Sequence, residues 1–137
     1  MKTRQKLAIH ELLSRAAYYF DLHDVDGLKS CFAEDANMLV NIADGQSFGP
    51  FEGRDAIMEL MSGTLTAQTD TRRHIICNIF FESEGKKEAL AVSTLVVSSV
   101  DSGEISLVTS GVYRDTVRRV DGTWLIADRH LDLDMPF

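Results

Sequence analysis

Apolar residues near the start of the chain recur every three or four positions. Ile9, Leu12, Leu13, Ala16 and Phe20 follow this spacing. On a helix of 3.6 residues per turn, such positions fall on one face. The pattern therefore predicts an amphipathic helix over residues 9–20.

Asp21 stands at the expected end of this helix. Leu13, Ala17 and Asp21 are spaced by four residues, so they form one row on the flank of the apolar face. The helix dipole disfavours a carboxylate at a helix C-terminus. Asp21 is therefore expected to point toward the core and to have a partner there; the alternative is a helix C-terminal residue in solvent.

The next part of the chain predicts shorter elements. Asp24 is a suitable N-cap for a second, short helix, and residues 36–42 favour a short strand. Residues 44–53 contain three glycines and a proline, which favours a loop. Gly53 is a suitable N-cap for a third helix, with an acidic residue in its first turn.

Beyond residue 70 the chain changes to long runs rich in β-branched residues. Four strands are expected, over residues 73–81, 88–100, 104–120 and 123–133. Their connections are short and contain glycine, so neighbouring strands should pair as antiparallel hairpins. Helices followed by a meander predict the α+β class. A sheet of such long strands must twist and coil, and an apolar pocket is expected between it and about three N-terminal helices.

Composition and charge narrow the class of protein. The chain has 137 residues, the usual size of one domain, and one domain over residues 1–137 is expected. The net charge of −7 argues against nucleic acid as a partner. No apolar run approaches 18 residues. We therefore expect no membrane partner, and we expect a cytoplasmic location. The two cysteines lack the spacing of a metal or redox site.

Asp21 and His74 are the main candidates for chemistry. They lie 53 residues apart, so only tertiary packing can bring them together. If they are adjacent, the carboxylate accepts the imidazole N–H, fixes the tautomer and makes the other ring nitrogen a better base. Such a dyad needs no metal and no cofactor. The alternative is a core histidine whose hydrogen bonds serve only the fold.

Three other polar residues are candidate substrate contacts. Asn78 lies four residues after His74 and is expected on the same strand face, either donating to an oxyanion or satisfying the backbone. Tyr113 either directs its hydroxyl into the pocket or packs as a core aromatic. Arg129 alternates with Asp128 and His130 on the last strand, so only one of these two sets faces the pocket unless a bulge intervenes.

Several motifs occur in an order that resembles a known family. They are Phe20-Asp21-Leu22-His23-Asp24, Phe32-Ala33-Glu34-Asp35-Ala36, Phe51-Glu52-Gly53-Arg54-Asp55-Ala56-Ile57, Arg73-His74-Ile75-Ile76-Cys77-Asn78, Gly111-Val112-Tyr113-Arg114-Asp115 and Asp121-Gly122-Thr123-Trp124-Leu125-Ile126. Together they resemble the SnoaL-like branch of the nuclear transport factor 2-like superfamily. The resemblance implies a cone of three helices and a curved sheet, and a homodimer or homotrimer formed through the outer face of the sheet.

The nearest groups within that superfamily are similar to scytalone dehydratase, hexachlorocyclohexane dehydrochlorinase, aromatic polyketide cyclases and the small subunits of ring-hydroxylating dioxygenases. In the first two, an Asp ending the first helix orients a His on the strand with R-H-x-x-x-N, and Asp21 and His74 match these positions. Arg129 matches an arginine of the dehydrochlorinase pocket. This chain departs from the dehydrochlorinase in having Arg72 two residues before the His. It departs from scytalone dehydratase in having Phe20 before the Asp, which leaves Tyr19 as a nearby candidate substrate contact.

Two classes of function follow from the resemblance. The first is a cofactor-independent lyase or isomerase that acts on a small, apolar, cyclic substrate through the Asp21 and His74 pair. The second is a non-catalytic role, as the small subunit of an aromatic-ring-hydroxylating dioxygenase or as a small-molecule binding module. Fold alone does not choose between them.

Overall fold

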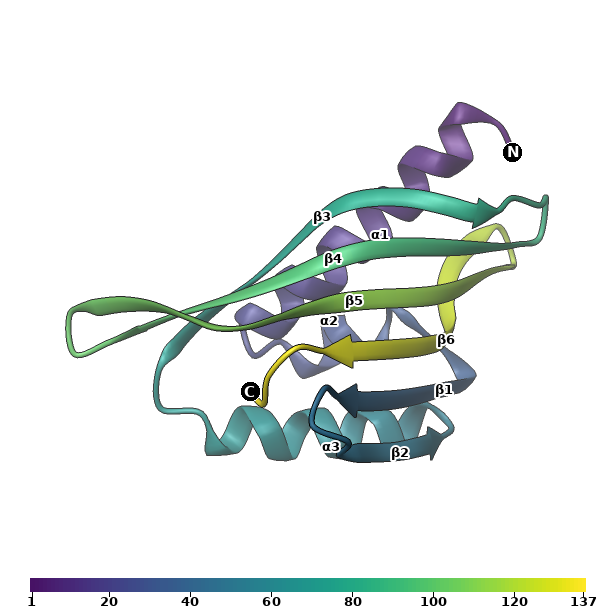
Figure 1. Ribbon diagram of the computed structural model, residues 1–137. Helices are drawn as coiled ribbons and strands as arrows, with labels where there is room; N and C mark the ends of the chain where they lie inside the picture. The colour runs from purple at the N-terminus through teal and green to yellow at the C-terminus, as the bar shows by residue number, and fades with distance from the viewer.

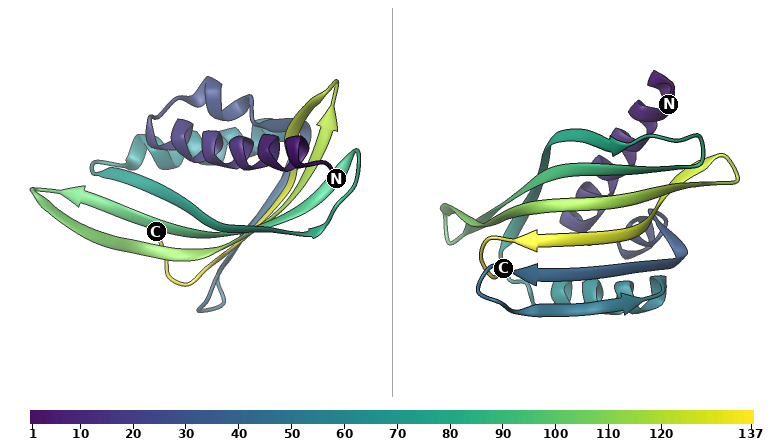
Figure 2. Two further views of the ribbon diagram at one scale, coloured as in Figure 1. Left: turned by 90° about the horizontal axis from the view of Figure 1, so that it is seen from above. Right: turned by 45° about the vertical axis from the view of Figure 1, so that its right-hand side comes forward.

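The computed structural model describes residues 1–137, with three helices lying against one face of a six-stranded sheet (Figure 1). The helices are α1 (Thr3–Asp21), α2 (Val25–Lys29) and α3 (Arg54–Ala67). Figure 2 shows the sheet strongly curved, with the helices on its concave side. The predicted α+β class is therefore confirmed.

The strands are β1 (Phe32–Ile42), β2 (Ser47–Glu52), β3 (Thr71–Ser83), β4 (Glu88–Asp101), β5 (Glu104–Val120) and β6 (Thr123–Leu133). They lie in the order β2-β1-β6-β5-β4-β3. Neighbours pair antiparallel except β1 and β6, which are parallel. The four long strands predicted after residue 70 are present as a meander, and β3 is an edge strand.

The helix ends follow the predicted capping residues. Asp24 precedes α2, and its Oδ1 accepts the Gly27 backbone N–H at 2.9 Å. Gly53 precedes α3 with φ 89°, a conformation that side-chain-bearing residues rarely adopt. The first helix is longer than its apolar pattern predicts and ends at Asp21.

The expectation of a loop over residues 44–53 is wrong for its second half. Ser47–Glu52 forms strand β2, which pairs antiparallel with β1. Glycine and proline usually mark loops, but an edge strand tolerates them because one side of its backbone has no partner in the sheet.

The core lies between the helices and the concave face of the sheet. Ile9 and Leu13 from α1, Ile57 from α3, and Phe32 and Ile126 from the sheet are at most 1% exposed. None of the three helices is long and apolar enough to cross a membrane.

Candidate functional site

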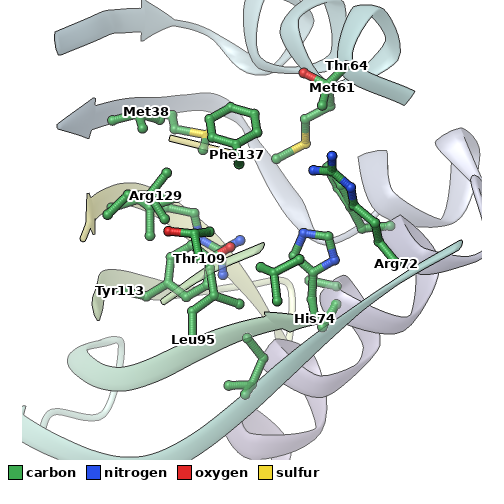
Figure 3. A pocket seen from close by; sticks show the side chains of 18 of the residues that line it. Met38, Met61, Thr64, Arg72, His74, Leu95, Thr109, Tyr113, Arg129 and Phe137 are labelled. Carbon is green, nitrogen blue, oxygen red and sulfur yellow. The ribbon is translucent and has the colours of Figure 1, made fainter. Parts of the chain in front are cut away.

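A pocket lies between α1, α3 and the concave face of the sheet (Figure 3). Sixteen of its 22 lining residues are hydrophobic, so it favours an apolar ligand. Its volume is about 80 Å³, several times the roughly 10–15 Å³ that one buried water needs. Met61 and Phe137 are among the side chains that line it (Figure 3).

Asp21 and His74 meet at the wall of this pocket. His74 Nδ1 lies 2.7 Å from Asp21 Oδ1. The same carboxylate accepts the His74 backbone N–H, at 3.0 Å for Oδ1 and 3.2 Å for Oδ2. This N–H is available because β3 is an edge strand, which pairs with β4 on one side only. The end of α1 is thus fixed to β3 by both the ring and the backbone of one residue.

These contacts determine which tautomer a neutral imidazole adopts. An ionised carboxylate is only an acceptor, so in a neutral ring Nδ1 carries the proton toward Asp21 and Nε2 keeps its lone pair. Figure 3 shows the ring projecting from β3 into the pocket. The side chains of His74 and Asp21 are only 13% and 10% exposed. The Phe20 ring meets the imidazole edge-on, with 4.5 Å between centroids, and restrains its rotation.

Arg129 and Tyr113 line another part of the pocket. Arg129 bonds the fully buried Asp115, with Nε to Oδ1 at 2.8 Å and Nη2 to Oδ2 at 3.1 Å. Its guanidinium lies 4.0 Å from the centre of the Tyr113 ring. Burial opposes the charge on Arg129, but Asp115 and Tyr113 outweigh this effect and raise the pKa of the guanidinium. Burial also raises the pKa of the Tyr113 phenol, with Arg129 opposing and Asp115 adding to the increase.

A β-bulge explains why Arg129 faces the pocket. Trp124 and Ile126 are buried on β6, and simple alternation would place Arg129 on the opposite face. The register with β5 shifts at this point: Val117 pairs with Ile126, whereas the preceding residue, Thr116, pairs with Asp128. The extra residue on β6 reverses the alternation, so Arg129 follows Trp124 and Ile126 to the concave side.

A second bulge removes Asn78 from the pocket, contrary to the expectation from strand alternation. Asn78 has φ 53° and is exposed. The β3 register shifts between Cys77 and Phe80, so that Ile79 takes over the inner face. Asn78 therefore does not share the face of His74, because the bulge inserts one residue between them.

Tyr19 also does not line the pocket. Its ring is partly buried against the core, near Tyr18, and its hydroxyl accepts a hydrogen bond from Arg15 Nη1 at 3.3 Å. Tyr19 precedes Phe20 on the helix, and the rotation of one residue carries it away from the pocket face that Phe20 occupies.

Arg72 was not among the candidate site residues, yet it lines the pocket beside His74. Its Nε donates to both carboxylate oxygens of Asp70, at 3.3 and 3.1 Å, and the Ser99 hydroxyl bonds the same carboxylate. This hydrogen bond from Ser99 lowers the pKa of Asp70; burial opposes the decrease and Arg72 adds to it. Strand alternation alone places Arg72 on the face of His74, a signal that the sequence contained.

The acidic and histidine residues of the site are dispersed. No group of three or more His, Cys, Asp or Glu side chains is arranged to hold a metal ion. The polar residues that line the pocket are His74, Arg72, Arg129, Tyr113, Thr64, Gln68 and Thr109.

A family model for the SnoaL-like domain matches residues 1–130. The chain therefore belongs to the SnoaL-like domain family, as its motifs predicted. No curated protein sequence matches the chain.

Solved structures share the fold over almost the whole chain. A protein of unknown function with a cystatin-like fold from Nostoc punctiforme has 24% identity and a TM-score of 0.81, covering 99% of this chain and 97% of that one. A candidate scytalone dehydratase from Novosphingobium aromaticivorans has 26% identity and a TM-score of 0.78, with 96% and 85% covered. The beta subunit of a candidate aromatic-ring-hydroxylating dioxygenase from the same species has 16% identity and a TM-score of 0.84, with 99% and 94% covered.

Proposed function

We propose that this chain is a cofactor-independent lyase or isomerase, of the dehydratase or cyclase type, that acts on a small apolar cyclic substrate. The observation that carries the proposal is the 2.7 Å contact between His74 Nδ1 and Asp21 Oδ1 at the wall of an apolar pocket. It leaves Nε2 of a neutral ring free to take a proton from a bound molecule. The 26% identity to a candidate scytalone dehydratase supports the same class.

The first step is removal of a proton from a carbon next to a carbonyl. His74 Nε2 takes this proton, and the electron pair of the C–H bond moves to form an enolate whose charge lies on oxygen. The ring becomes an imidazolium, which the Asp21 carboxylate stabilises through Nδ1–H. Tyr113 and Arg129 line the same pocket, and we assign them to stabilise the enolate oxygen.

The second step returns the proton from His74. If the substrate has a β-hydroxyl, the enolate electrons expel it and the His74 proton completes a water molecule, which gives dehydration. If it has no leaving group, the proton returns to another carbon of the enolate system, which gives isomerisation. Both outcomes balance without an oxidant or reductant, and the base contributes about 10² to 10⁴ in rate.

The test is turnover of a panel of cyclic ketones and β-hydroxyketones, followed by loss of water or by uptake of solvent deuterium. His74→Ala is expected to lower the rate by about 10² to 10⁴, and Asp21→Asn should lower it strongly because the tautomer is no longer fixed. His23→Asn is the matched control, since His23 is exposed with φ 58° and Asn tolerates that conformation. Unchanged turnover in His74→Ala would contradict the proposal, and no turnover on any substrate would favour the binding module or dioxygenase subunit.

A further inference from the structure

The charge of the pocket lining differs from the charge of the whole protein. The chain has a net charge of −7, yet no Asp or Glu is among the residues that line the pocket. The charged lining residues are Arg72 and Arg129. Each has a carboxylate partner that does not line this pocket, Asp70 for Arg72 and Asp115 for Arg129. An anion in the pocket therefore depends on the N–H donors that these two pairs leave free.

The two arginines differ in how many of their donors are already used. Arg129 bonds the carboxylate of Asp115 through two nitrogens, and its plane packs on Tyr113. Arg72 bonds Asp70 through Nε alone, and neither of its terminal nitrogens has an acceptor within the protein. Two N–H donors in one plane match the two oxygens of a carboxylate. Arg72 therefore has both terminal nitrogens free for a ligand, whereas Arg129 has only Nη1 entirely free.

Arg72 stands where the apolar pocket joins a wider polar opening of about 540 Å³. Four residues line both spaces: Thr64, Gln68, Arg72 and Phe137. Figure 3 shows the Arg72 guanidinium on the same side of the pocket as His74, facing Met61 and Thr64 of α3. The side-chain amide of Gln68 has no hydrogen-bond partner in the protein and adds a neutral donor at this neck. Asp101 and Asp70 line only the outer opening, so the anion is favoured on the inner side.

Arg72 and His74 are two residues apart on β3 and face the same way. The rise along a strand puts their Cα atoms roughly 6.5–7 Å apart. One small ring can therefore place an anionic group at Arg72 and an acidic C–H at His74.

We infer that the ligand of this pocket is a small cyclic carboxylic acid, with its carboxylate bound by the terminal nitrogens of Arg72. This inference deepens the proposed function and rests on it for the role of His74. In this arrangement Arg72 is a specificity-determining residue that holds the substrate ring with its reactive carbon toward Nε2. A neutral ring of the same shape lacks this anchor.

The experiment compares the binding of acids with that of their own amides. The probes are isobutyrate, cyclopentanecarboxylate and benzoate, each paired with its neutral amide, with dissociation constants from ligand-observed NMR. Wild type is expected to bind at least one acid about tenfold or more tightly than its amide, as for a hydrogen bond to a charged group. Arg72→Gln should reduce this ratio to about two or less, and Arg72→Lys should keep part of it.

Arg73→Gln is the matched control, because Arg73 is the exposed neighbour with the same charge, and alternation turns its side chain to the other face of β3. The ratio should be unchanged in this variant. Equal binding of every acid and amide by wild type, which needs no variant, overturns the inference, and so does a preference that survives in Arg72→Gln. His74→Ala should keep the preference, so that failure of the proposed proton transfer and failure of anion binding give different results.

Discussion

Arg129 and Asp115 form a buried ion pair that ties β6 to β5 beneath the pocket. Their side chains are 6% and 0% exposed, and two hydrogen bonds of 2.8 and 3.1 Å join them. Because the pair is removed from water, each charge depends on the other. The same pair holds the guanidinium over Tyr113, so the shape of this wall of the pocket depends on it.

Removing one partner of this pair is expected to destabilise the protein strongly. Asp115→Ala should lower the free energy of unfolding by about 3–5 kcal/mol, because it leaves the Arg129 charge buried without a counter-ion. Chemical denaturation followed by circular dichroism measures the change. Asp35→Ala is the control, since Asp35 is 73% exposed in its ion pair with Arg118, and solvent screening leaves little or no change in stability to be expected there. Equal effects of the two variants would show that burial does not govern the pair.

The Tyr113 phenol should lose its proton at a higher pH than an ordinary tyrosine does. Burial raises the pKa of its phenol above the ordinary value of 10.0, so the folded protein holds this proton where the unfolded chain releases it. Stability from this group is therefore complete below pH 10 and declines as pH rises further. The ultraviolet titration of wild type minus that of Tyr113→Phe isolates this phenol. A midpoint at or below 10 would show that the ring is accessible to solvent.

Asn78 should act through its backbone and not through its amide. At φ 53° glycine is unstrained, whereas a β-branched residue is strained, so Asn78→Val should cost about 1–2 kcal/mol or more of stability. Asn78→Gly should retain both stability, within about 0.5 kcal/mol, and ligand binding. A specific loss of binding or turnover in Asn78→Gly, with stability unchanged, would show that the Asn78 amide contacts the ligand.

Much of this fold follows from patterns along the chain. The β-branched runs and the short glycine-containing turns predicted β3 to β6 to within two residues at each end, because long antiparallel strands joined by tight turns have few alternative arrangements. Strand β2 was missed because its Gly49 and Pro50 favour a loop, and only pairing with β1 makes them part of a sheet.

The site was less predictable than the fold. Asp21 and His74 were paired by family resemblance, since nothing in the local pattern brings residues 53 positions apart into contact. Strand alternation fails for Asn78 and does not settle Arg129, because Asn78 lies within a β-bulge and Arg129 lies just beyond one. A single inserted residue reverses every later side chain in the strand. Arg72 needs no tertiary information, because alternation along the strand alone puts it on the face of His74.

The expected homo-oligomer remains a prediction, and the β4–β5 hairpin offers a place to test it. Ile105 and Leu107 are each 75% exposed on a hairpin that extends beyond the neighbouring strands (Figure 1). Light scattering after size exclusion should give the mass of a dimer or trimer for wild type. Substituting both residues by Glu should lower that mass, whereas Leu7→Glu, which changes an exposed residue of α1, should not. A monomeric wild type at micromolar concentration would refute the expectation.

The state of the His74 ring tests the central claim most directly. Nitrogen-15 spectra of the neutral imidazole, compared between wild type and Asp21→Asn, report which ring nitrogen carries the proton. The account predicts that His74 in wild type is protonated at Nδ1 and free at Nε2, and that Asp21→Asn loses this preference. A wild-type ring protonated mainly at Nε2, or a tautomer ratio that Asp21→Asn leaves unchanged, would contradict the claim that Asp21 prepares His74 as a base.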